Sequence, residues 1–464
     1  MNHCPVLPPC MILYYSPQEK SFLAGPANDN QPALIEVTNE EAHFLMLCDG
    51  NLTISEIAAR LHRDEGDVKT IATKFSGEPH AVLQFLEEEK NEYTPDPHTE
   101  IAYQILNELD SANSYTNNIT QLHQYHTETI SDAVEQFEST ETTIAHAYSR
   151  PHPSLGGVSY GAKFAKELSE IGLIDKGKAI LEIGGGTGYL ARDFLKYLKD
   201  NKPRTYKHIH YTMLELSPVL IKSQKEQTAL HCPVISHVTG DALAAPFSSG
   251  TFSLIIANEM IADLPSVRMK KEWVDNGSAD QIPRESLPAL KFIKNFNIPV
   301  DDAFPEFLVN LGAWQMMEKI YHLLSHGGTA VIIEYGSPCM YPVAVHLKEH
   351  TEYSIHFGHL EKIANKLGFE TRLEGLADFL KMDPDVQVLN SASFGTLNQS
   401  ILPHFNMKPL PTLSFTPEML GEFLGDLYHN LHNLQFHPLK EAAGPGNPSA
   451  FYALTLFKRE AQPS

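Results

Sequence analysis

AILEIGGGTGYLARDFLKYL, residues Ala179–Leu198, is the stretch that decides the fold of this chain. The apolar run Ala179–Ile183 predicts a buried strand, and the residues from Tyr189 onward have the spacing of an amphipathic helix. The glycines between them let the backbone turn sharply and approach a ligand closely, with amide groups pointing at it. The stretch therefore predicts a ligand-binding turn in an α/β domain.

The spacing of the glycines separates two classes of ligand. Residues 186–191, GTGYLA, satisfy the loose dinucleotide pattern G-x-G-x-x-A. Glu182, Gly184, Gly186 and Gly188 fit E-x-G-x-G-x-G better, and an acid at the strand end suits a cationic ligand without phosphates. This pattern resembles that of class I S-adenosylmethionine methyltransferases. A nicotinamide-dependent oxidoreductase is the competing interpretation.

Two more acidic residues follow later strands, in the order that such methyltransferases use. Glu215 ends the second predicted strand, where a carboxylate can accept both ribose hydroxyls of an adenosyl group. Asp241, followed by Ala242, resembles the position that holds the adenine amino group. Glu182 is expected to organise the glycine loop or to face the methionine amino group. Capping of the next helix is the alternative role for Glu215 and Asp241.

The chain from Ser159 onward alternates between strand and helix patterns. This alternation predicts a doubly wound, mainly parallel sheet of the class I methyltransferase (Rossmann-like) type, with its ligand at the carboxyl ends of the strands. Residues 268–312 and 336–407 interrupt the alternation, and we expect them to form caps that shape the substrate site. The predicted strands are 179–183, 209–214, 234–238, 253–257, 329–334 and 451–457.

Three parts are expected along the chain. Residues 1–95 read as a small winged-helix unit with short strands and helices, the last of them a helix at 81–90. Residues 96–155 are polar and histidine-rich and predict a helical connector folded over the site of the next domain. Residues 156–464 form the methyltransferase domain.

Composition and charge narrow the partners. The 464 residues carry a net charge of −22, which argues against nucleic acid or an anionic membrane, because phosphate binding needs clustered Lys and Arg. The five cysteines are scattered, so neither a disulfide framework nor a thiolate zinc site is indicated, and no metal site is predicted. No signal peptide or membrane-spanning apolar run is evident, and we expect a cytoplasmic protein.

Residues 255–265, IIANEMIADLP, resemble the N-E-x-x-D-A-L-P signature of the MidA-like methyltransferases, whose eukaryotic relatives are mitochondrial protein arginine methyltransferases. The resemblance covers roughly residues 156–460. Ala262 stands where the family has Asp, Glu334 replaces another Asp, and Leu376 replaces Gln. These departures put the acceptor in doubt. The other matching stretches are residues 215–218 with Gln224, 327–336, 354–360 and 378–380.

Transfer to a guanidinium requires a group that takes its proton and holds its planar fork, which paired carboxylates do well. Glu259 is the candidate, with Asn258 orienting it, and Asn258 is also expected to contact the cofactor. Asp263 or Glu334 would assist, and His356 could accept a proton near neutral pH. The alternatives are a helix N-terminus at Asn258-Glu259 and a packed histidine at His356.

Residues 41–61, EAHFLMLCDGNLTISEIAARL, resemble PqqD and the related RiPP recognition elements. Such domains bind the leader of a precursor peptide, which adds as a strand to a small sheet. Ala33–Val37 and the helix near Asp67–Phe75 are the expected groove. The competing interpretation, a nucleic-acid-binding winged helix, is disfavoured because residues 1–95 carry six basic and fifteen acidic side chains.

Together these patterns predict a methyltransferase that uses S-adenosylmethionine to modify a ribosomally synthesised precursor peptide, whose leader the N-terminal unit binds. An arginine nitrogen is the first expectation for the acceptor. Histidine, an amine or a carboxylate is the alternative within enzymes, and a non-catalytic assembly protein is the alternative outside them. The sequence does not fix the oligomeric state, and a homodimer is one option.

Overall fold

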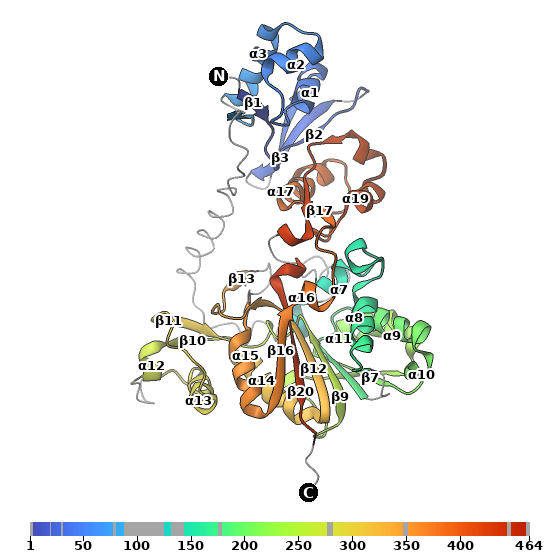
Figure 1. Ribbon diagram of the computed structural model, residues 1–464, viewed down its shortest axis with the longest axis vertical. Helices are drawn as coiled ribbons and strands as arrows, with labels where there is room; N and C mark the ends of the chain where they lie inside the picture. Colours follow the sequence, from blue (N-terminus) through green and yellow to red (C-terminus); the bar gives the residue numbers. More distant parts are fainter. Residues whose placement is uncertain are drawn as a thin grey trace. The chain divides into compact units, whose positions relative to one another are not determined.

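The computed structural model describes residues 3–18, 20–28, 31–77, 80–87, 125–130, 143–174, 179–275, 282–346, 351–442 and 447–460. Two compact units make up the chain, and each combines segments that are far apart in sequence (Figure 1). The first unit is Met1–Asn107 with Asp385–Ala443, and the second is Glu108–Pro384 with Gly444–Ser464. Within the described residues, no helix is long and apolar enough to cross a membrane.

A mainly parallel sheet forms the centre of the second unit (Figure 1). Five neighbouring strands, β8, β7, β6, β9 and β12, run parallel to one another. Strand β20 is antiparallel to both of its neighbours, β12 and β16. A short strand, β15 (Ile355–His356), pairs with β12. The order is β8 (Ile235–Thr239), β7 (His210–Glu215), β6 (Ala179–Ile183), β9 (Phe252–Asn258), β12 (Leu324–Ser337), β20 (Phe451–Lys458) and β16 (Phe369–Gly375).

Helices cover both faces of this sheet. On one side α8 (Tyr160–Glu170) packs on α9 (Tyr189–Asn201), and on the other α14 (Leu311–Leu323) packs on α15 (Phe357–Leu367) (Figure 1). The inner strands β6, β7 and β9 are almost entirely buried because both faces are covered, whereas the edge strands β8 and β16 are more exposed. The predicted doubly wound sheet is confirmed, and each predicted strand lies in it.

The chain leaves β6 towards β7 and β8 and then returns to the other side of β6 to form β9. The strand order therefore reverses between β6 and β9. In open α/β sheets the crevice at such a reversal, outside the carboxyl ends of the strands, is where ligands bind.

The two expected caps differ from the prediction. Residues 268–312 form the β10–β11 hairpin (Val267–Lys270, Glu306–Val309) with α12 (Lys271–Asp275) and α13 (Leu287–Phe296), and α13 packs on α14 and α15. Residues 336–407 are not one insertion. Their first part supplies α15 and β16 to the core of the second unit, and the part from Asp385 onward belongs to the first unit.

An antiparallel sheet organises the first unit. Its order is β18 (Leu431–His432), β2 (Ile12–Tyr14), β3 (Ser21–Asn28) and β4 (Gln31–Val37). The helices α1 (Asn39–Met46) and α2 (Ile54–Leu61) each begin with a capping box, and α3 (Glu65–Ser76) contacts both. The winged-helix interpretation of this unit stays a prediction.

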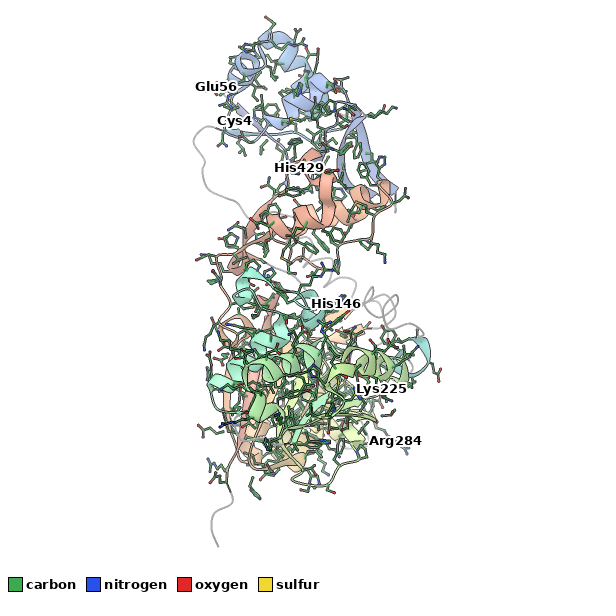
Figure 2. The ribbon with its side chains drawn as sticks, turned by 90° about the vertical axis from the view of Figure 1, so that its right-hand side faces the viewer. Cys4, Glu56, His146, Lys225, Arg284 and His429 are labelled. Atoms are coloured by element: carbon green, nitrogen blue, oxygen red, sulfur yellow. The ribbon has the colours of Figure 1, made fainter. Side chains whose placement is uncertain are left out.

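Strand residues alternate between the two faces of a sheet, so the early strands have two apolar faces to cover. The segment Asp385–Ala443 packs against one of these faces. Leu13 and Leu23 face the core that contains α1–α3, while Ile12, Tyr14 and Phe22 pack with residues of the late segment, such as Leu397, Ile401 and Leu402. The predicted boundary, which gave all of residues 156–464 to the methyltransferase domain, is therefore wrong for this segment. Figure 2 labels Cys4 and His429, which come from the two segments of this unit.

The helix predicted at residues 81–90 is also wrong where the structure describes it. Gln84–Glu87 form strand β5, which pairs antiparallel with β1 (His3–Val6). Pairing with a distant segment overrides the local helical spacing. Residues 88–90, and residues 96–124 and 131–142 of the expected connector, lie outside the described part of the chain.

Asn433 tests the joining of the two segments in the first unit. Its Nδ2 donates to the carbonyl oxygens of Leu7, Pro8 and Met11 at 3.4, 3.1 and 2.8 Å. We expect Asn433→Ala to lower the free energy of unfolding by about 1–3 kcal/mol, because buried carbonyls lose their donor. Chemical denaturation measures this.

Asn297→Ala is the matched control for that prediction. Asn433 and Asn297 both have left-handed backbone, with φ of +66° and +52°. Both variants therefore carry the same backbone cost. Equal destabilisation by the two variants would show that the three hydrogen bonds contribute nothing.

Candidate functional site

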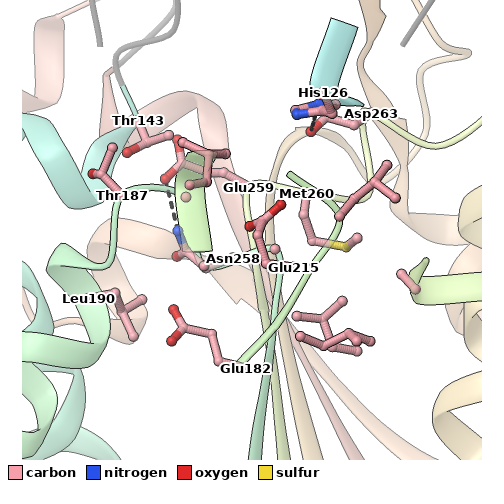
Figure 3. A pocket seen from close by; sticks show the side chains of 18 of the residues that line it. His126, Thr143, Glu182, Thr187, Leu190, Glu215, Asn258, Glu259, Met260 and Asp263 are labelled. Carbon is pink, nitrogen blue, oxygen red and sulfur yellow. Dashed lines mark hydrogen bonds and ion pairs between the residues drawn. The ribbon is translucent and has the colours of Figure 1, made fainter. Parts of the chain in front are cut away.

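A cavity of about 280 Å³ lies at the carboxyl ends of β6, β7 and β9, where the strand order reverses (Figure 3). Polar and glycine residues from four strand ends line it. Two segments that precede the sheet also line it, at residues 126, 143 and 145. The predicted residues in its lining are Glu182, Gly184, Gly186, Gly188, Glu215, Asp241, Ala242, Asn258, Glu259 and Asp263.

The glycine loop after β6 has no room for side chains. A Cβ on Gly184, whose φ is +67°, would lie 2.6 Å from the Cβ of Met260. A Cβ on Gly188, whose φ is +98°, would lie 3.0 Å from the Cα of Gln224. Both positions need glycine for conformation as well as for space. The loop therefore brings bare backbone against the cavity, as the sequence pattern predicts.

Glu182 ends β6 and is buried. The hydroxyl of Tyr211 donates to its Oε2 at 2.9 Å. Burial raises the pKa of Glu182 to about 7. The side chain lies below the glycine loop and lines the cavity, so either of its two predicted roles is compatible with its place (Figure 3).

Glu215 is held by donors from its own turn and from α11 (Pro218–Gln227). The amide of Ser217 donates to Oε1 at 3.0 Å, and Nε2 of Gln224 donates to Oε2 at 3.1 Å. The same Nε2 lies 2.9 Å from the carbonyl oxygen of Gly186, so Gln224 ties Glu215 to the glycine loop. Burial raises the pKa of the Glu215 carboxyl.

Two features of this corner fit a ligand that carries hydroxyl groups. Each oxygen of an ionised carboxylate can accept more than one hydrogen bond, so Glu215 keeps capacity for two hydroxyl donors. Oε1 of Gln224 is buried and has no partner in the described part of the chain. Together with the glycine loop, these residues fit the ribose of an adenosyl group.

Asp241 has the capping role that was considered for it, and its adenine-binding role stays a prediction. Its Oδ1 accepts from the amide of Leu243 at 2.8 Å and so caps the short helix at Ala242–Ala244. It also lines the cavity, as does Ala242. The cap fixes the carboxylate at the edge of the cavity, where an exocyclic amino group could donate to it.

Asn258 and Glu259 end β9 on the opposite side of the glycine loop. The Glu259 carboxylate accepts from the backbone amide of Ile144 at 2.9 and 3.0 Å and from Nδ2 of Asn258 at 2.9 Å. Glu259 has a φ of +51°, which is unusual outside glycine, and such strain concentrates at functional sites. No helix starts at this pair, because turns follow it in residues 261–264.

The electrostatics of Glu259 differ from those of an ordinary surface carboxylate. Burial raises its pKa to about 7, although hydrogen bonds from Ile144 and Asn258 act in the opposite direction. Burial therefore brings the titration of this carboxyl towards neutral pH. A buried carboxyl with this pKa can accept a proton and release it again.

The remaining predicted residues lie at different distances from the cavity. Asp263 lines it, and its Oδ2 is 3.7 Å from Nε2 of His126 (Figure 3). Glu334 is buried beneath it, where it accepts from the amides of Ala262 and Tyr335 at 3.2 and 3.0 Å. Its pKa is well above the usual range because of burial and the nearby Glu259.

His356 does not line the cavity. Its ring stacks on that of His359, with centroids 3.6 Å apart, and its Nδ1 accepts from the His359 amide at the start of α15. Burial lowers its pKa. The packed-histidine alternative describes this placement, so we leave His356 out of the proposed reaction.

Sequence reasoning missed the residues that the connector and α8 bring to the site. His126 and Thr143 line the cavity (Figure 3). The hydroxyl of Tyr160 donates to Oδ1 of Asn258 at 2.6 Å. The polar pattern of residues 96–155 predicted only that this segment folds over the site. No spacing in the sequence pairs Tyr160 with a residue 98 positions away.

Gly184→Ala tests whether this loop is a binding surface. We expect the dissociation constant for S-adenosylmethionine to rise by about tenfold or more, because overpacking against Met260 costs about 1–3 kcal/mol. Gly172→Ala is the control, since Gly172 also has positive φ (+77°) but open space around it. Titration calorimetry gives both constants, and an unchanged constant for Gly184→Ala would contradict the role of the loop.

Comparison with known proteins gives one family match. Residues 160–352 match the family model described as "Putative S-adenosyl-L-methionine-dependent methyltransferase". No curated protein matches the chain.

Several solved structures resemble the chain at low identity. One is a superfamily member from Burkholderia thailandensis, described as a "likely methyl transferase" and bound to S-adenosyl-homocysteine; it is 13% identical, with a TM-score of 0.41 and coverage of 79% of this chain and 95% of that one. An uncharacterised protein of the same superfamily and organism is 13% identical, with a TM-score of 0.40 and coverage of 80% and 96%.

A third structure is the phosphoethanolamine N-methyltransferase 2 of Haemonchus contortus with S-adenosylhomocysteine, at 12% identity, a TM-score of 0.35 and coverage of 71% and 61%. The assignment rests on the family match and on the geometry of the cavity, not on these likenesses. The second unit of this chain contains the matched residues 160–352, and it is an S-adenosylmethionine-dependent methyltransferase domain.

Proposed function

We propose that this domain methylates a nitrogen nucleophile in a peptide, with an arginine guanidinium nitrogen as the first candidate. The observation that carries the proposal is Glu259, a buried carboxyl in the cofactor cavity with a pKa of about 7. Methylation of a guanidinium releases a proton, and this carboxylate is placed to take it. Asp263, which also lines the cavity, is a second carboxylate that favours a cationic acceptor.

The residues divide into those that hold the cofactor and those that handle the acceptor. Gly184–Gly188 and Glu215 would hold the methionine and ribose parts, and Asp241 the adenine amino group. S-adenosylmethionine supplies a methyl group on a sulfonium, which makes the methyl carbon electrophilic. The chain's task is then to align a nucleophile with that carbon.

Glu259 accounts for the proton in this reaction. As the acceptor nitrogen forms its bond to the methyl carbon, the carbon–sulfur bond breaks and its electron pair stays on sulfur. The proton on nitrogen passes to the Glu259 carboxylate. Glu334 is less suited to this step, because Glu259 lines the cavity and Glu334 does not.

The first unit supports the proposal of a peptide substrate. Within the described residues β4 pairs only with β3, so its other edge presents unpaired backbone groups. An extended peptide can add to such an edge as a further strand. We propose that the leader of a precursor peptide binds along Ala33–Val37, which raises the local concentration of the acceptor for the second unit.

The proposal is tested by mass spectrometry of a candidate precursor peptide, or of an arginine-containing peptide library, after incubation with the protein and S-adenosylmethionine. We expect a gain of one methyl mass per transfer, and fragmentation that places it on an arginine. Methylation of histidine, an amine or a carboxylate would replace the arginine assignment. Cofactor binding with no methylation of any peptide would contradict a peptide substrate.

Glu259→Gln tests the proton acceptor. The amide keeps an oxygen for the Ile144 amide but cannot take a proton, so we expect kcat to fall by about 10²–10⁴-fold. In the wild type the carboxylate is the active form, so kcat should rise with pH through about 7 and then level off. Glu370→Gln on β16, an exposed position, is the control, and a wild-type profile in Glu259→Gln would contradict the assignment.

Hydrogen exchange tests the leader site independently of catalysis. Adding the leader peptide should slow exchange of the amides of Ala33–Val37, because the outer edge of β4 gains hydrogen-bond partners. Strand β2 already pairs on both sides, with β3 and β18, and is the internal control. Protection confined to the second unit would place the peptide elsewhere and leave the first unit without this role.

A further inference from the structure

The contacts of Asn258 extend the site beyond the residues that line the cavity. Its Oδ1 accepts from the hydroxyl of Tyr160 at 2.6 Å, and its Nδ2 donates to Oε1 of Glu259 at 2.9 Å. We propose that Tyr160 is a positioning residue, which fixes the orientation of the Asn258 amide and thereby the carboxylate of Glu259. This inference rests on the proposed function, in which Glu259 takes the proton of the acceptor.

The hydroxyl of Tyr160 acts only as a donor towards Asn258. The side chain is 1% exposed. Burial and the charges of Glu259, Glu334 and Glu182 raise its pKa well above the usual range, so it stays protonated at any pH at which the protein works. The short distance to Oδ1 fits a hydroxyl donor.

The donor on one side and the carboxylate on the other select one orientation of the amide. In the opposite orientation Oδ1 of Asn258 would face the Glu259 carboxylate, and two acceptors would meet in a buried place. Without the Tyr160 hydroxyl, nothing on that side favours Oδ1 over Nδ2. The Nδ2 donor would then face Glu259 for only part of the time.

The packing of α8 against α9 fixes the position of the Tyr160 hydroxyl. A Cβ on Gly161 would lie 2.6 Å from the carbonyl oxygen of Leu190, so the two helices are in backbone contact at this point. The Tyr160 ring is parallel to that of Phe164, with centroids 6.2 Å apart, and its amide donates to the carbonyl of Tyr148 at 2.8 Å. A rigid scaffold therefore holds a donor that reaches the base through one asparagine.

The surroundings of Glu259 make each donor to it consequential. Negative charges act on the site from several elements, and the backbone amides of Ile144 and Ala145 are the other donors to the carboxylate. Loss of the Asn258 donor would raise the Glu259 pKa further, so the base would ionise only at higher pH. The charged and titratable groups on the elements around Glu259 are Glu334 on β12, Glu352 on β14, Glu182 on β6, Asp263, His126 and His146.

The test uses two probes, S-adenosylmethionine and S-adenosylhomocysteine, so it needs no acceptor. The first carries a positive sulfonium and the second a neutral thioether, so an ionised carboxylate in the cavity favours the first. The ratio of their dissociation constants is measured by calorimetry from pH 6 to pH 9. The pKa of Glu182 is also about 7, so Glu182 contributes to the pH dependence of this ratio. Subtracting the pH profile of Glu259→Gln from that of the wild type leaves the pH dependence that is due to Glu259.

Tyr160→Phe should move the midpoint of the pH dependence that is due to Glu259 upward by about 0.5–1 pH unit. A hydrogen bond to a charged group is worth about one pKa unit. Tyr148→Phe, at another buried tyrosine of the same unit, should leave the midpoint in place. Asn258→Ala removes the donor completely and should give an upward shift at least as large, and adding Tyr160→Phe to it should give no more. That non-additivity would assign the effect to the path through Asn258 even if Tyr160→Phe alone folds poorly.

A wild-type midpoint in Tyr160→Phe, with the Glu259 dependence intact, would overturn the role of Tyr160 and leave the proposed function standing. Additive shifts in the double variant would also overturn it. If Glu259→Gln leaves the ratio unchanged at every pH, Glu259 does not ionise in the cavity, and both proposals fall.

Discussion

The site depends on the burial of carboxylates at the carboxyl edge of a parallel sheet. Glu182, Glu215 and Glu259 end three neighbouring strands, and each loses most of its hydration. An unpaired buried charge is costly, so each needs donors from the protein. Tyr211 supplies one to Glu182, Gln224 and the turn after β7 supply two to Glu215, and Asn258 with α7 (Ile144–Ala147) supplies those to Glu259.

The position of the glycine loop is coupled to the positions of the acidic residues, because the same side chains contact both. Gln224 donates to Glu215 and to the carbonyl of Gly186, while its backbone lies where a side chain on Gly188 would be. Met260 closes the loop from the β9 side. The cavity is thus shaped by contacts between three strand ends, and a change at one of them reaches the others.

The sequence predicts well those features that depend on a local pattern of residues, such as the strands and the acidic residues at their ends. Inner strands such as Ala179–Ile183 and Phe252–Asn258 are mainly apolar because helices cover both faces of the sheet. The acidic residues at the strand ends line one cavity. The family match over residues 160–352 agrees with that reading. His356 shows the limit of the approach, since a residue type suited to proton transfer lies instead in a ring stack.

What the sequence does not predict depends on contacts between distant segments. Gln84–Glu87 become a strand only because His3–Val6 lies beside them. Asp385–Ala443 joins the first unit because Leu397 and Ile401 cover the second face of an early sheet, and no local signal announces that. Tyr160 reaches Asn258 through the packing of α8 on α9, so its role emerges only from the fold.

The most direct test of the central claim is a crystal structure of the full chain with S-adenosylhomocysteine. The account predicts the ribose hydroxyls on the Glu215 carboxylate, the amino-acid part along Gly184–Gly188, and the sulfur facing Glu259. Binding with the ribose away from Glu215, or in a place other than the β6–β9 cavity, would contradict it.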